Sequence, residues 1–156
     1  MNIIKKINIY LYISILVIID QISKIYIIKN CFNTSKDIIK NILRFTYCEN
    51  KGGAFSLASG KIYLFIIMNL IIISGLIIYY EKNRKKIKTF EKISITLIIS
   101  GGLSNLLDRI FRGFVVDFID INQLFNYAIF NVADMFIVVG IFSWIIYLIC
   151  NINKNS

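Results

Sequence analysis

The sequence predicts an all-α membrane protein, with four transmembrane helices and a small β-rich element outside the membrane. Of its 156 residues, 57% are hydrophobic, and the mean hydropathy is +0.70. A soluble domain of this length has too little interior to bury so much apolar surface. Because the chain has no internal repeat and no long linker, we expect residues 1–156 to form one membrane-embedded domain.

A transmembrane helix needs about 20 mostly apolar residues. The expected spans are about residues 7–28, 62–80, 89–107 and 132–149. The first span follows Lys5 and Lys6 as in a signal peptide, but no small-residue cleavage site follows it. We therefore interpret it as a retained helix.

Lysine and arginine set the expected orientation. They are dense in the connection at about residues 81–88, which the positive-inside rule assigns to the cytoplasm. With four spans, both termini are then cytoplasmic, and the connections at about residues 29–61 and 108–131 face outside. The excess of basic residues, a net charge of +9, is expected to contact membrane phospholipids and not nucleic acid.

The outer connections contain patterns typical of strands. Apolar and polar side chains alternate over residues 43–48 and 115–120. Asn50-Lys51-Gly52-Gly53 is typical of a turn, and residues 54–57 are a candidate return strand. We expect a small sheet with one apolar face against the membrane surface.

The chain has no histidine. This excludes Ser-His-Asp and Cys-His nucleophiles and every metal site that uses imidazole. Cys31, Cys48 and Cys150 lack the spacing of a metal site or a disulfide framework, although a Cys31–Cys48 disulfide stays open. Acid–base chemistry must therefore use Asp, Glu, Lys, Tyr or Cys, and we expect no metal and no cofactor.

Two aspartates in apolar sequence are the leading candidates for that chemistry. Asp117 lies among Val116 and Phe118, and Asp134 lies at the start of the last span. A carboxylate in such surroundings is costly, so two of them suggest a pair that shares a proton. With Asn131 as N-cap, Asp134 stands where a helix dipole favours negative charge, so it is expected to be the ionised member. The position is equally compatible with a capping residue.

Polar residues at the end of the third span form a second group. Asn105, Asp108, Arg109 and Arg112 share one helix face. Asp108 can pair with an arginine there, so both a structural and a catalytic role stay open. The small residues at 101, 102 and 104 favour a close approach of another helix.

Five motifs, in order along the chain, resemble those of the lipoprotein signal peptidases, the signal peptidase II family of aspartic proteases. They are Asp20-Gln21-Ile22-Ser23-Lys24, Asn50-Lys51-Gly52-Gly53-Ala54-Phe55, Asn105-Leu106-Leu107-Asp108-Arg109, Val115-Val116-Asp117-Phe118 and Phe130-Asn131-Val132-Ala133-Asp134. Each motif alone is weak, but the five together with four spans are a specific combination.

The resemblance implies an endopeptidase of the bacterial inner membrane that removes signal peptides from diacylglyceryl-modified prolipoproteins, cleaving before the lipidated cysteine. The implied catalytic pair is Asp117 and Asp134, near the outer face. Substrate-binding residues would be Asn50, Asn105, Arg109 and Asn131, and structural residues Asp20, Lys24 and Asp108. One chain would suffice as a monomer.

The main alternative is a small proton-coupled transporter with Asp117 and Asp134 as relay carboxylates. It predicts carboxylates nearer the middle of the membrane and a broken-helix repeat, and the sequence shows neither. A non-catalytic assembly factor and a different intramembrane aspartic protease are further alternatives, the latter lacking its Gly-x-Gly-Asp motif here.

Overall fold

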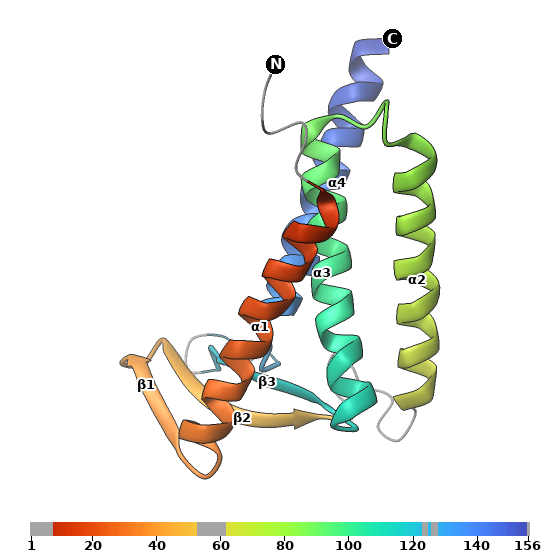
Figure 1. The fold of residues 1–156 in the computed structure, drawn as a ribbon. Helices are drawn as coiled ribbons and strands as arrows, with labels where there is room; N and C mark the ends of the chain where they lie inside the picture. The colour runs from red at the N-terminus through yellow and green to blue at the C-terminus, as the bar shows by residue number, and fades with distance from the viewer. Residues whose placement is uncertain (1–7, 53–61, 123–124, 126–127, 156) are drawn as a thin grey trace.

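A computed structural model describes residues 8–52, 62–122, 125 and 128–155, the last four by their backbone only. Within these residues the chain forms four long helices and three strands (Figure 1). The helices are α1 (Ile9–Cys31), α2 (Ile62–Asn83), α3 (Thr89–Phe111) and α4 (Val132–Asn155). The strands are β1 (Ser35–Ile39), β2 (Leu43–Asn50) and β3 (Val115–Asp120). All four helices are long and apolar enough to cross a membrane, so the expected fold class is confirmed.

The helices extend beyond the apolar spans read from the sequence. The third ends at Phe111, whereas its apolar stretch ends near residue 107. Asp108 and Arg109 therefore lie on the last turns of a helix and not in the following loop. The position matters because a helix holds their side chains at fixed spacing beside Asn105.

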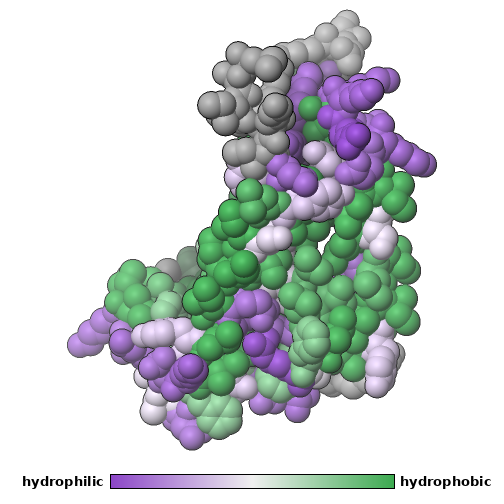
Figure 2. Space-filling model, in the orientation of Figure 1, coloured by the Kyte–Doolittle hydropathy of each residue, from purple (hydrophilic) through white to green (hydrophobic). Residues whose placement is uncertain are grey.

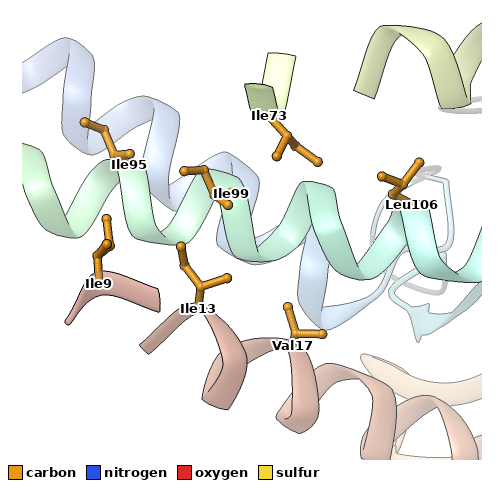
Figure 3. Close-up of a cluster of buried hydrophobic side chains, with 7 residues drawn as sticks. All are labelled: Ile9, Ile13, Val17, Ile73, Ile95, Ile99 and Leu106. Carbon is orange, nitrogen blue, oxygen red and sulfur yellow. The ribbon is translucent and has the colours of Figure 1, made fainter. Parts of the chain in front are cut away.

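Helix α3 is the centre of the bundle and packs against the other three helices. Figure 3 shows the apolar cluster around it, with Ile95, Ile99 and Leu106 of α3 facing Ile9, Ile13 and Val17 of α1 and Ile73 of α2. The outward faces of the helices stay apolar, and Figure 2 shows them as a broad hydrophobic band between two more polar ends. A bilayer is the solvent that suits such a surface.

Helices α3 and α4 approach closely through glycines, as the small residues of the third span predict. A Cβ atom on Gly101 would lie 2.7 Å from Ile137 Cγ1 and closer still to the carbonyl oxygen of Ala133. On α4, a Cβ atom on Gly140 would lie 2.9 Å from the carbonyl oxygen of Ser94. Only glycine permits this contact, which brings the start of α4 against α3.

The sheet is antiparallel in the order β1-β2-β3 (Figure 1). The alternating segments at 43–48 and 115–120 are neighbouring strands, with Cys48 opposite Asp117. The sequence did not indicate β1, whose side chains are all exposed. The candidate return strand at 54–57 lies outside the described residues.

One face of the sheet packs on α1 through Phe45 and Phe118, which contact Ile27 and Cys31. The sheet therefore sits at the end of the bundle where α1 ends and α4 begins. Cys31 and Cys48 carry free thiols, so the Cys31–Cys48 disulfide left open above does not form.

Candidate active site

Asp117 is placed by strand β3. Its neighbours Val116 and Phe118 point to one face and are buried, so the carboxyl group of Asp117 points to the other. That side chain is only 2% exposed. Asn50, at the end of β2, donates from Nδ2 to Asp117 Oδ2 at 2.8 Å, and its own Oδ1 accepts from the N–H of Gly52 at 3.0 Å. The predicted turn thus holds Asn50 against the carboxyl group.

Asp134 is placed by the first turn of α4. Its backbone N–H donates to Asn131 Oδ1 at 2.9 Å, and the N–H of Asn131 donates to Asp134 Oδ2 at 3.2 Å. This reciprocal pair is a capping box, with Asn131 as N-cap as predicted. Capping therefore uses one carboxyl oxygen and leaves the other free for a second partner.

Two side-chain amides connect the aspartates. Asn131 Nδ2 donates to Asp117 Oδ1 at 2.6 Å and to Asn105 Oδ1 at 3.2 Å. Asn105 Nδ2 then donates to Asp134 Oδ1 at 2.8 Å. Each carboxyl group thus accepts from two N–H donors, and residues from β2, β3, α3 and α4 meet at one point. Asp134 therefore has a contact with α3 in addition to its capping contact.

Burial governs the protonation of Asp117. Desolvation, and next the charge of Asp134, raise the pKa of Asp117 to about 7, against the lowering effect of the amides of Asn50 and Asn131. The ordinary pKa of an aspartate is near 4. Asp117 therefore keeps a proton at a higher pH than an ordinary aspartate does and can serve as an acid.

Lys24 lies behind this centre and is completely buried. Its ammonium group is 2.8 Å from Asp20 Oδ2 and 2.8 Å from Asp108 Oδ2, and it donates to Asn105 Oδ1 at 3.0 Å. Asp20 in turn accepts from the N–H of Ala133 at 2.8 Å. Lys24 thus fixes which end of the Asn105 amide faces Asp134, and Asp20 ties α1 to the start of α4.

Asp108 is buried away from the two candidate catalytic carboxyl groups. It pairs with Arg112 and Lys24, and its Oδ2 accepts from the N–H of Val116 at 3.2 Å. Gln21 donates to Asp108 Oδ1 at 3.0 Å and accepts from Arg112 at 3.0 Å. These contacts favour the structural alternative for Asp108. Sequence reasoning missed Gln21, although its place one residue after Asp20 within an apolar span was a usable signal.

Arg109 lines the same cavity as the two aspartates. Among the described residues, it forms no ion pair with either of them. Its guanidinium lies 5.3 Å from the centre of the Phe65 ring and donates to the carbonyl oxygen of Asn105 at 3.3 Å. The ring of Phe65 gives it a favourable cation–π partner. Within the part of the chain that the structure describes, the guanidinium donates no hydrogen bond to a carboxylate, and it lines the cavity that contains both aspartates.

A cavity of about 360 Å³ connects these groups. Its polar floor is made by Asn50, Asn105, Arg109, Asp117 and Asp134. Its walls are mostly apolar side chains of α2 and α4, namely Phe65, Met68, Ile72, Ile137 and Val138, and the polar Asn69 of α2 also lines it. Among the described residues, no group of three acidic or cysteine side chains is arranged to hold a metal ion. The cavity therefore brings together two carboxyl groups, side-chain amide donors and mostly apolar walls.

Fold and site together define a membrane protein of four spans, with two buried carboxyl groups that accept hydrogen bonds from side-chain amides where a small sheet meets the helices. A family model described as "Signal peptidase (SPase) II" matches residues 12–150. The chain belongs to the signal peptidase II family and is a protease. Family membership gives no support to the transporter alternative.

Relatives and solved structures cover nearly the whole chain. A lipoprotein signal peptidase of Clostridioides difficile is 43% identical over 90% of this chain and 94% of its own length. A lipoprotein signal peptidase of Streptococcus agalactiae is 39% identical over 92% of this chain and 93% of its own length. A bacterial membrane enzyme solved by the in meso method at 2.3 Å resolution superposes with a TM-score of 0.84 at 33% identity, covering 95% of this chain and 91% of the other. The four apolar helices and the bacterial family fit a multi-pass protein of the inner membrane.

Proposed function

We propose that the protein is an aspartic endopeptidase that removes signal peptides from diacylglyceryl-modified prolipoproteins, cleaving before the lipidated cysteine. The observation that carries the proposal is the position of Asp117 and Asp134 at the floor of a cavity with mostly apolar walls. The side-chain amides of Asn131 and Asn105 connect the two carboxyl groups by hydrogen bonds. The names of the relatives supply the substrate class. The motif match supplies the cleavage position.

The proposed reaction divides acid and base between the two aspartates. Asp134, at the N-terminus of α4, is the ionised member and accepts a proton from a water molecule that attacks the scissile carbonyl carbon. Asp117, whose pKa is raised to about 7, gives its proton to the carbonyl oxygen. When the C–N bond breaks, the proton held by Asp134 passes to the leaving nitrogen, and the proton on the tetrahedral oxygen returns to Asp117. Both carboxyl groups then regain their starting states.

The amides and Arg109 have proposed binding roles. Asn105 and Asn131 hold the two carboxyl groups in place and can donate to the substrate backbone. Asn50 does the same from the sheet side, and Arg109 can bind a substrate carbonyl. The mostly apolar walls from α2 and α4 suit a signal helix that lies in the bilayer. The acyl chains on the substrate's cysteine would then remain in the lipid.

The proposed setting follows from the distribution of charge. The basic connection at 81–88 lies at the opposite end of the bundle from the sheet (Figure 1). The positive-inside rule puts that end and both termini in the cytoplasm, so the aspartates lie near the outer face. We propose that one chain, in contact with membrane phospholipids and without cofactor or nucleic acid, carries the whole activity as a single domain.

Cleavage of a diacylglyceryl-modified prolipoprotein by the purified protein tests this proposal. Asp117→Asn and Asp134→Asn keep size and polarity but remove the titratable group, so each variant should stay folded and lose cleavage. Asp120→Asn is the matched control, because Asp120 is a buried aspartate of the same strand that pairs with Arg44 outside the cavity. If either of the first two variants cleaves like the wild type, the assignment of the pair is wrong.

A further inference from the structure

A second cavity lies at the end of the bundle opposite the sheet, and residues of α1, α2 and α3 line it. Its volume is about 800 Å³. Ile15 and Leu16 of α1 and Ile93 and Leu97 of α3 form an apolar wall. Since an outward-facing apolar wall at this depth borders lipid, its natural occupant is a hydrocarbon chain.

The rim of this cavity is cationic. Of the residues that the structure describes, Arg84, Lys85 and Lys92 line it, and no aspartate or glutamate does. The nearest carboxylate on α2, Glu81, accepts from the hydroxyl of Tyr10 at 2.7 Å and lies 3.4 Å from Arg84. It offsets part of the positive charge of Arg84. Figure 2 shows hydrophilic atoms gathered over this end of the molecule, directly above the hydrophobic band.

We propose that this cavity binds one anionic phospholipid, with its phosphate at Arg84, Lys85 and Lys92 and an acyl chain along the wall of α1 and α3. Basic pockets between transmembrane helices on the cytoplasmic side bind anionic headgroups in this way. The amino-terminal region of a signal peptide does not fit, because it is itself positively charged and is repelled by the rim. A zwitterionic lipid fills the volume but gains less from the three cations.

This site is separate from the two aspartates, and its occupancy does not depend on the proposed function. It does bear on stability, because a lipid that fills the space between α1 and α2 binds only the folded bundle. We expect an anionic lipid to raise the thermal stability of the protein.

The test is native mass spectrometry of the purified, delipidated full chain with phosphatidylglycerol or phosphatidylcholine added. The wild type should retain one phosphatidylglycerol and little phosphatidylcholine. Arg84→Gln with Lys85→Gln should weaken phosphatidylglycerol binding by about 30-fold, since each basic residue near a membrane surface contributes about one kcal/mol. The matched control is Lys82→Gln with Lys86→Gln, which removes the same charge from exposed positions that do not line the cavity.

A variant without a change in charge tests the apolar wall. Ile15→Trp fills the cavity from a side chain that is 44% exposed, so it should fold and still lose the bound lipid. Phosphatidylglycerol should raise the melting temperature of the wild type and of the control with Lys82→Gln and Lys86→Gln. It should not raise that of Ile15→Trp or of the variant with Arg84→Gln and Lys85→Gln. Equal loss in both charge pairs would overturn the proposal, as would unchanged binding in Ile15→Trp or equal retention of phosphatidylcholine.

Discussion

Replacing Gly101 by alanine should disable the site without touching any of its polar groups. Gly101 lies one turn before Asn105 on α3, against Ala133 and Ile137 of α4. The added methyl group would lie 2.7 Å from Ile137 Cγ1, a distance that real Cβ atoms essentially never show, and closer still to the backbone oxygen of Ala133. The side chain of Ile137 can rotate away, but the carbonyl group cannot.

The first turn of α4 must therefore move away from α3. Asp134 directly follows Ala133, so the hydrogen bond of 2.8 Å from Asn105 to Asp134 lengthens or breaks. Overpacking of this kind costs about 1–3 kcal/mol of stability. A misplacement on the order of 1 Å at a reacting group costs about 100-fold in rate. We expect kcat/KM to fall by about that factor while the protein still folds.

Two other glycines make the assay specific. Gly75→Ala on α2 is the neutral control, since its new methyl group meets no atom within 4 Å. Gly140→Ala disturbs the same helix interface, at 2.9 Å from the carbonyl oxygen of Ser94, but almost two turns beyond Asp134. It should lower the melting temperature as Gly101→Ala does and lower kcat/KM less. Cleavage by Gly101→Ala at the rate of Gly75→Ala would refute the reasoning.

Four further predictions concern charge and protonation. Cleavage should fall about tenfold per pH unit above about 7, because Asp117 must keep its proton, and a pH–rate profile flat to pH 9 would contradict this. Asn50→Leu removes a hydrogen bond that lowers the pKa of Asp117, so the fall should move to higher pH; an unmoved profile would show that Asn50 does not act on this carboxyl group. Since folding raises the pKa of Asp117, the wild type should lose stability between about pH 4 and 7, by up to about 1.4 kcal/mol per unit. Asp117→Asn should show a smaller loss in melting temperature over this range. Lys24→Met leaves Asp20 and Asp108 as buried charges without their shared cation, so it should lower the free energy of unfolding by about 3–5 kcal/mol. Unfolding of the variant and the wild type in one detergent measures this difference. A loss below about 1 kcal/mol would contradict a stabilising role of this network.

Two candidate site residues, Asp117 and Asp134, could be identified from the sequence because they are carboxylates in apolar surroundings. Asn131 could be identified as the N-cap of the last span, and the structure has it in that position. Asn50 and Arg109 were given a binding role only by the motif resemblance. The orientation of the amides did not follow from the pattern. It depends on Lys24, one side chain from another helix that contacts two carboxylates and Asn105 at once.

Local periodicity and composition by themselves determined the four helices, the strand character of 43–48 and 115–120, and the capped start of α4. These features depend on neighbours along the chain, and a sequence displays such neighbours directly. Only the tertiary structure decided that β1 joins the sheet, that Arg112 and Gln21 hold Asp108, and that Asn131 connects the two aspartates. Those contacts join residues of separate elements, and their geometry is set by how closely α3 and α4 pack at Gly101 and Gly140. A pattern along the chain carries no direct measure of that distance.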